Sequence, residues 1–269
     1  AMTTNGDPTD GFENTDWQEP IYRTTLMHQH NLSISGGNEK TRYFLSGGFM
    51  KQNGFIKGFE LERGNFRSNI DTQVTKDISV SLNVAGNDYY QPGGDSYENQ
   101  TTNNVVGVLL YAAPFVPLEY EGMPASGYRG ASNPDYAAGH SGYSKTRTMR
   151  LETSAKIEYS FPFLKGLKAG MFVGWDWQDR DSRSFKYSYE LMLYKPESKK
   201  YVRQYASNLQ PTGGMSVGDE KEQQVVLRPS ISYNQKFGLH DVGALFLYEQ
   251  TERKGNTLTG YRSDFALLD

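Results

Sequence analysis

Hydrophobic and polar residues alternate along this chain with a period of two. In the clearest stretch, residues 149–161, the odd positions carry no charge and the even positions are polar or charged. The uncharged positions are Met149, Leu151, Thr153, Ala155, Ile157, Tyr159 and Phe161. This pattern is typical of a β-strand with one apolar face. After a turn at 162–166 the same alternation runs through 167–178, so the two stretches predict a hairpin.

Three further pairs of alternating segments predict hairpins by the same rule. They are residues 65–74 with 78–84, residues 224–234 with 242–248, and residues 30–34 with 43–49. The chain is therefore predicted to form about eight strands, each paired with its neighbour in sequence.

The connections between these strands are alternately short and long. The short ones are 36–40, 74–77, 162–166 and 235–240, and the long ones are 51–61, 86–143, 179–221 and the chain from 251 onward. All short turns then fall on one rim of the sheet, as in outer-membrane β-barrels. Such barrels carry aromatic belts at both membrane interfaces, here expected from Tyr159, Phe161 and Phe163 on one side and Trp175 and Trp177 on the other.

A soluble antiparallel sheet with one wet face also alternates, and it is the competing interpretation. Strand length argues against it. Soluble strands usually run to five or six residues, whereas the hairpins at 65–84 and 144–178 keep alternating for ten or more residues per strand.

Composition narrows the choice of partner and rules out several classes of protein. The 269 residues include 28 Lys and Arg against 31 Asp and Glu, so net charge gives no reason to expect a nucleic acid. There is no Cys, which excludes disulfides and thiolate chemistry. The longest apolar stretch, residues 105–117, contains Gly107 and Pro114 and is too short for a membrane-spanning helix.

Several segments resemble the SusC/RagA family of TonB-dependent outer-membrane transporters. "NTDWQEPIYRT" is similar to the family's stretch between plug and barrel, and "HNLSISGGNEKTRYFLSGGFMKQNGFIKG" with "FELERGNFRSNIDTQVTK" is similar to its first barrel strands. "YAAPFVPL", "TRTMRLETSAKIEYSFPFLKGLKAG" and "NQKFGLHDVGALFLYEQTE" are similar to later loops and hairpins of that barrel.

The resemblance implies an all-β fold, an antiparallel up-and-down sheet that forms part of a large transmembrane β-barrel. Residues 1–27 would be a linker entering the barrel, and residues 28–269 a partial barrel with long loops at 86–143 and 179–221. Members of the family import glycan or peptide fragments in the outer membrane. They work with a SusD-like surface lipoprotein and with TonB, which acts through a plug region expected to be missing here, so membrane lipid, an oligosaccharide or peptide, and these two proteins are the implied partners.

The sequence carries no recognisable catalytic motif, and we expect neither an enzyme nor a cofactor or metal ion. His28 and His30 would share one strand face, but two imidazoles do not complete a typical zinc site. The charged residues Arg150, Glu152, Lys156 and Glu158 form two pairs at spacing two along one strand, and they are more simply a water-facing wall than acid–base groups.

Tyrosines in the first long loop are the candidate substrate-binding residues. Tyr89, Tyr90 and Tyr111 could stack on sugar rings or pack against peptides, and Tyr97, Tyr120 and Tyr128 are further tyrosines of that loop. The apolar stretch 105–117 is expected to form a short helix in the mouth, ended by Pro114. Alternatively, these rings belong to the membrane-interface belts and the apolar stretch only fills a gap.

Two other functions remain open on the sequence alone. One is a soluble β-rich binding or interaction module, and the other is a carbohydrate-active enzyme built on a β-sandwich. An open barrel segment differs from both because its outer face needs lipid or detergent.

Overall fold

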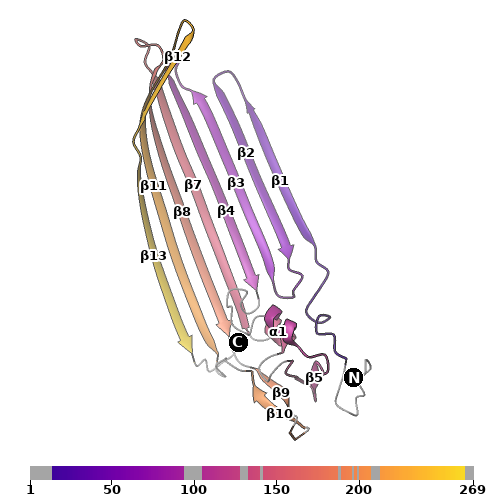
Figure 1. The fold of residues 1–269 in the computed structure, drawn as a ribbon. Coiled ribbons are helices and arrows are strands. Elements are labelled where there is room, and N and C mark those ends of the chain that lie inside the picture. The colour runs from indigo at the N-terminus through magenta and orange to yellow at the C-terminus, as the bar shows by residue number, and fades with distance from the viewer. Residues whose placement is uncertain are drawn as a thin grey trace.

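A curved antiparallel sheet of nine strands makes up most of the molecule (Figure 1). The computed structural model describes residues 14–93, 105–127, 133–139, 142–186, 189–195, 197–198, 200–206 and 213–263. The strands of this sheet are β1 (Met27–Gly37), β2 (Thr41–Asn53), β3 (Glu60–Gln73), β4 (Ile78–Gly93), β7 (Gly142–Ser160), β8 (Leu167–Lys186), β11 (Gly214–Phe237), β12 (His240–Leu247) and β13 (Gln250–Ser263).

Strands of this sheet that follow one another in sequence are also neighbours in space, in the order β1-β2-β3-β4-β7-β8-β11-β12. β7 pairs with β8 through the turn at 161–166, with Tyr159 opposite Ala169 and Ile157 opposite Met171. The predicted up-and-down antiparallel pairing is confirmed. Among the described residues the sheet does not close on itself, so the fold is one segment of a barrel wall and not a β-sandwich.

β12 and β13 form one strand that is interrupted opposite Pro229 of β11. Ser230 pairs with Leu247 and Leu227 pairs with Gln250, so the register continues with no inserted residue. Pro229 lies at the break and has no N–H to donate, although its carbonyl oxygen accepts a hydrogen bond from the Tyr248 nitrogen at 3.1 Å. Counted this way, the sheet has the eight strands that the sequence predicts.

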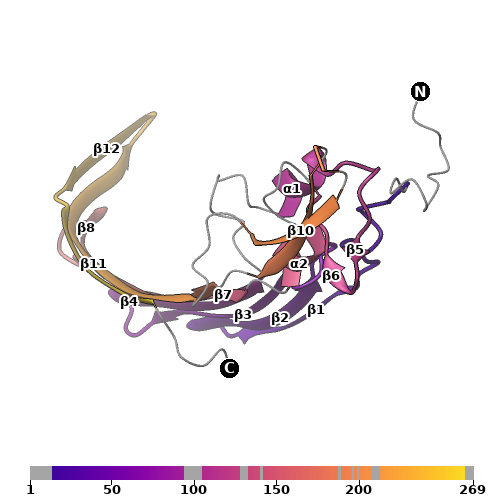
Figure 2. The same ribbon diagram turned by 90° about the horizontal axis from the view of Figure 1, so that it is seen from below.

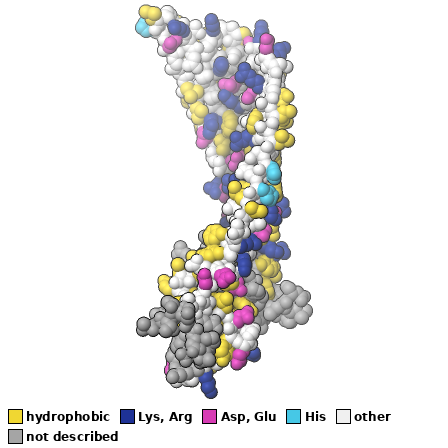
Figure 3. Space-filling model, turned by 90° about the vertical axis from the view of Figure 1, so that its right-hand side faces the viewer, with side chains coloured by type: hydrophobic (Ala, Val, Ile, Leu, Met, Phe, Trp, Pro, Cys, Tyr) yellow, Lys and Arg dark blue, Asp and Glu magenta, His cyan; other side chains and the backbone are white. Residues whose placement is uncertain are grey.

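The register divides the side chains of the sheet between two faces. Leu151 lies opposite Trp177 and Ile157 opposite Met171, whereas Glu152 lies opposite Asp176 on the other side. The face of Leu151 is called the outer face below, and the face of Glu152 the inner face. Seen end on, the sheet is curved (Figure 2), and in Figure 3 hydrophobic side chains gather along its convex margin while charged ones crowd the hollow side. The alternation predicted within 149–161 and 167–178 is confirmed, with Leu151, Ile157, Met171 and Val173 on the outer face and Arg150, Glu152 and Lys156 on the inner face.

Most buried side chains lie in a layer of loops at one end of the sheet. This rim layer consists of α1 (Val105–Tyr111), β5 (Glu119–Tyr120), β6 (Met123–Pro124), α2 (Pro134–Gly139), β9 (Glu190–Lys195), β10 (Lys200–Tyr205), and residues 14–26 and 54–59. In the end-on view it lies over the hollow side of the sheet (Figure 2). The helix expected within 105–117 is present as α1.

Residues 14–26 pack into the rim layer, although the sequence suggests a linker there. Trp17 and Ile21 are almost fully buried, and the Trp17 Nε1 donates to the carbonyl oxygen of Ala113 at 2.9 Å. The Ile21 carbonyl accepts from the backbone nitrogen of Lys57, which ties this stretch to the β2–β3 connection. This connection, expected at 51–61, is limited to residues 54–59.

Several strands run further than the sequence predicts. β4 continues to Gly93, β8 to Lys186, and β11 begins at Gly214, so the loops expected at 86–143 and 179–221 are shorter. The chain after 251 was expected to be a long connection, and this is wrong because β13 continues to Ser263. Beyond Trp177 the outer face carries Asp179, Asp181 and Arg183, so the alternation ends while the backbone ladder continues.

No helix among the described residues has the length and apolar character needed to cross a membrane.

Candidate functional site

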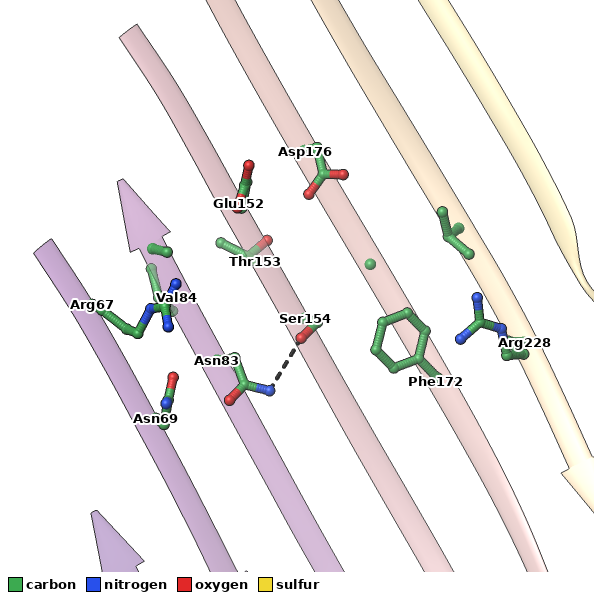
Figure 4. Close-up of a pocket in the computed structure, with 13 residues that line it drawn as sticks. Arg67, Asn69, Asn83, Val84, Glu152, Thr153, Ser154, Phe172, Asp176 and Arg228 are labelled. Carbon is green, nitrogen blue, oxygen red and sulfur yellow. Dashed lines mark hydrogen bonds between the residues drawn. The ribbon is translucent and has the colours of Figure 1, made fainter. Parts of the chain in front are cut away.

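The inner face carries an open polar hollow near the middle of the sheet. Its volume is about 540 Å³, and it is lined from β3, β4, β7, β8 and β11. Figure 4 shows its side chains, which include Arg67, Asn69, Asn83, Glu152, Ser154, Phe172, Asp176 and Arg228. Each comes from the same side of its strand because alternate residues of a strand share a face.

The polar groups of this hollow are only partly engaged with one another. Asn83 Nδ2 donates to Ser154 Oγ at 3.2 Å, and the Arg228 guanidinium lies over the Phe172 ring at 5.1 Å while binding the carboxylate of Glu249. Glu152 and Asp176 face each other across the strands. Within the described residues neither carboxylate has an ion-pair partner, so both can accept hydrogen bonds from a polar occupant.

Toward the long loops, charged side chains of the inner face are engaged with polar or oppositely charged neighbours. Arg150 donates through Nε and Nη2 to Gln178 Oε1, and Arg253 Nη2 lies 2.6 Å from Glu222 Oε2. Lys156 and Glu158 form an ion pair of 3.0 Å on the same face nearer the turns. The sequence reading of these residues as a water-facing wall agrees with their placement.

The side chain of Asn133 joins several segments of the rim layer by hydrogen bonds. Its side-chain nitrogen Nδ2 donates to the carbonyl oxygens of Leu118 and Ala125, at 3.1 and 2.9 Å. Its Oδ1 accepts from the backbone nitrogens of Asp135 and Tyr136, which caps the start of α2. Pro134 follows as the first helical residue, a position that suits proline because that N–H has no helical partner.

Aromatic rings are concentrated in the rim layer. Tyr120 and Tyr201 stack at a centroid distance of 4.0 Å, and Tyr194 meets Tyr201 at 5.3 Å. Burial, together with the negative charges of Glu119 and Asp135, raises the pKa of Tyr136. Tyr120, Tyr194 and Tyr201 therefore form one cluster of aromatic rings in the rim layer.

Helix α1 turns an apolar edge away from this core. Val105 is buried, whereas Val106, Leu110 and Tyr111 are exposed. The exposed fraction is 76% for Leu110 and 62% for Tyr111. The helix lies on the hollow side of the sheet in the end-on view (Figure 2). Its exposed edge is thus available to a molecule in the mouth of the barrel.

The structure separates the three predicted binding tyrosines. Tyr89 and Tyr90 lie in β4 and not in a loop, and as successive strand residues they point to opposite faces. Tyr89 lies opposite Thr148 on the inner face, whereas Tyr90 lies opposite Arg147 on the outer face. Tyr90 therefore cannot share a ligand with Tyr89 and Tyr111. Tyr97 and Tyr128 fall outside the described residues.

Sequence reasoning missed Tyr194 and Tyr201, which fell within a predicted loop. Residues 190–195 and 200–205 form the β9–β10 hairpin, with Tyr194 opposite Tyr201. The apolar run at 191–194 and the apolar pair at 201–202, divided by the Pro-containing segment "KPESKK", are a hairpin signal that could have revealed them.

His28 and His30 lie on the outer face, with ring centroids 5.6 Å apart. Among the described residues, no three His, Asp or Glu side chains are grouped closely enough to hold a metal ion.

A curved up-and-down sheet with one apolar and one polar face defines the wall of a transmembrane β-barrel. No protein-family model matches the chain. It is similar to the TonB-dependent receptor P3 of Formosa agariphila, with 41% identity over 76 residues, and to the TonB-dependent receptor SusC of Bacteroides thetaiotaomicron, with 26% identity over 192 residues. These matches cover 28% and 63% of this chain.

Solved structures support the same fold. The RagAB peptide transporter matches 95% of this chain with a TM-score of 0.72 and 18% identity, and the "open-open" state of the RagAB peptide importer matches 95% with a TM-score of 0.69 and 20% identity. The resemblance to TonB-dependent receptors of the SusC/RagA type is confirmed. The chain spans only 8% and 19% of the two curated relatives and 28% of each solved chain.

Proposed function

We propose that this chain forms the beginning of the barrel of an outer-membrane, TonB-dependent importer of glycan or peptide fragments. The observation that carries the proposal is the division of one continuous sheet into an apolar outer face and a polar inner face, in a chain whose sequence relatives are TonB-dependent receptors. An apolar outer band is what lipid requires, and a polar wall suits a water-filled or plugged lumen.

The inner hollow and the rim layer supply the two kinds of contact that such cargo needs. Glu152, Asp176 and Asn83 offer acceptors and donors to hydroxyl or amide groups, and Tyr89 and Tyr111 offer flat faces to sugar rings or apolar side chains. The hollow is open and mainly polar, which suits passage of a polar chain rather than tight enclosure of a small molecule.

The proposed partners follow from the same placement. A SusD-like surface lipoprotein would meet the rim layer, where α1 exposes Val106, Leu110 and Tyr111. TonB would act through a plug region, whose surface the polar inner face would contact.

Deletion of the complete gene tests the proposed import. Cells lacking it, and the same cells complemented with the full-length gene, are given labelled oligosaccharide and labelled peptide mixtures. We expect uptake of one mixture to be lost on deletion, restored by complementation, and abolished by a proton uncoupler. Equal uptake of both mixtures with and without the gene would contradict the proposal. Membrane fractionation of the complemented cells checks the outer-membrane location, and co-purification checks the lipoprotein.

A further inference from the structure

A second hollow lies on the outer face, across β1, β2 and β3. Its volume is about 830 Å³, and its floor is Gly47. Leu45 and Phe49 flank Gly47 along β2, while Leu32 and Phe66 lie opposite it on the neighbouring strands. Four large apolar side chains thus surround one residue that has no side chain.

The hollow exists because Phe66 turns toward another glycine. Phe66 lies opposite Gly47 on β2 and opposite Gly86 on β4. Its ring covers Gly86, where an added Cβ would lie 2.8 Å from the Phe66 Cζ. At Gly47 the nearest atom to an added Cβ is the Asn65 carbonyl oxygen, 3.9 Å away, so the space above Gly47 stays open.

The walls of this groove are well exposed in the chain itself. Leu32 is 80% exposed and Phe66 49%, and Ile34 continues the apolar lining toward the short turn. The groove is continuous with the apolar band of the barrel's outer face, where the surrounding medium is lipid. An apolar groove in that medium fits a hydrocarbon chain.

The end of the groove nearest the rim layer is polar, and its charges balance. His30 lies opposite Phe49 and His28 opposite Lys51. Lys51 Nζ lies 2.6 Å from Glu62 and 3.8 Å from Glu60, and Arg23 lies 4.0 Å from Glu60. Arg23 and Lys51 are balanced by Glu60 and Glu62, so this end of the groove suits a headgroup without net charge, whereas a glycolipid with several phosphates needs an excess of cations.

We propose that this groove is a binding site for one zwitterionic phospholipid. One acyl chain lies over Gly47 between Leu32 and Phe66, and the headgroup lies by His28, His30 and Lys51. The site depends on the barrel fold and not on the proposed cargo.

Lipid titration of the full-length transporter tests the site. The delipidated protein in detergent receives phosphatidylethanolamine, and bound lipid is counted by native mass spectrometry. Gly47→Leu fills the groove without meeting backbone. The new side chain takes the place of part of the acyl chain, and the loss of that chain's packing contacts should weaken binding about tenfold. Gly260→Leu is the matched control, since Gly260 is an equally open glycine on the outer face of β13, far from the groove.

A second variant keeps the test decisive if Gly47→Leu fails to assemble. Leu32→Ala removes one wall and adds no bulk, so it should also weaken phosphatidylethanolamine binding. Equal affinity of the wild type and the assembled groove variants would overturn the proposal. Displacement of phosphatidylethanolamine by a phosphorylated lipopolysaccharide at equal concentration would overturn it as well, since the groove would then select the other lipid.

Discussion

Asn133 and Tyr189 exchange hydrogen bonds in the rim layer. The backbone nitrogen of Asn133 donates to Tyr189 Oη at 3.0 Å, and that hydroxyl donates to the Asn133 carbonyl oxygen at 3.3 Å. Tyr189 precedes β9, and Asn133 caps α2, so this contact joins two long connections that are 56 residues apart in sequence. The rim layer is therefore held as one unit by buried polar contacts as well as by its small apolar clusters.

Asn133→Ala should loosen the rim layer without preventing barrel assembly. The substitution removes the cap of α2 and leaves the Leu118 and Ala125 carbonyl oxygens without their donor, at a cost of about 2 kcal/mol. We expect faster cleavage within the rim layer during limited proteolysis of the full-length protein. Ser198→Ala, in the exposed β9–β10 turn, is the control and should leave the cleavage rate unchanged. An unaltered rate in Asn133→Ala would mean that the apolar clusters alone hold the layer.

Cysteine labelling should distinguish the two faces of the sheet. Ile157 and Glu158 are successive residues of β7, and Ile157 is 47% exposed in the chain itself. In the membrane, we expect lipid to cover Ile157 and water to reach Glu158. A water-soluble maleimide applied to the full-length protein in outer membranes should label Glu158→Cys and spare Ile157→Cys. Detergent-unfolded samples of both variants, which should label equally, control for thiol reactivity.

Substitutions of Tyr89, Tyr111 and Tyr90 should differ in their effect on cargo affinity according to where each ring lies. If Tyr89 and Tyr111 contact cargo, replacing either ring by Ala should weaken affinity for the imported fragments about two- to tenfold, the range expected for one aromatic contact. Tyr90→Ala is the matched control, because its ring lies on the outer face. Affinity is measured by titration of the full-length transporter. A loss in Tyr90→Ala equal to that in Tyr89→Ala would place the effect in the stability of β4 rather than in the site.

The sheet was predictable from sequence wherever one face is apolar and the other is polar. In the stretch from Met149 to Tyr159 the odd residues are uncharged and the even residues are polar, which is the pattern of a strand with two different faces. The pairing of this strand with 167–178 follows from the short turn between them. Beyond Trp177 the outer face carries Asp179 and Asp181, both faces are polar, and the period disappears although β8 continues to Lys186.

The candidate site was less predictable because it depends on contacts between distant segments. Placing Tyr89 and Tyr90 in a loop was wrong, since polar neighbours on both faces conceal the end of β4. The stack of Tyr120 on Tyr201 joins two connections 81 residues apart, and no local pattern encodes it. The groove over Gly47 likewise depends on which of its two glycine neighbours the Phe66 ring covers.

A charge placed on the outer face should impair assembly, whereas the same charge on the inner face should be tolerated. Val173 lies in the apolar band, opposite Ala155 and Leu227, so Val173→Lys should cost about 2–4 kcal/mol if the position lies near the bilayer midplane. Thr148→Lys introduces the same side chain on the inner face of β7, where water or polar groups can solvate it. We expect a reduced yield of heat-modifiable, folded protein for Val173→Lys and a normal yield for Thr148→Lys. Comparable yields of the two full-length variants would show that the outer face of β8 does not contact lipid at this position, because a desolvated ammonium group cannot be accommodated there without cost.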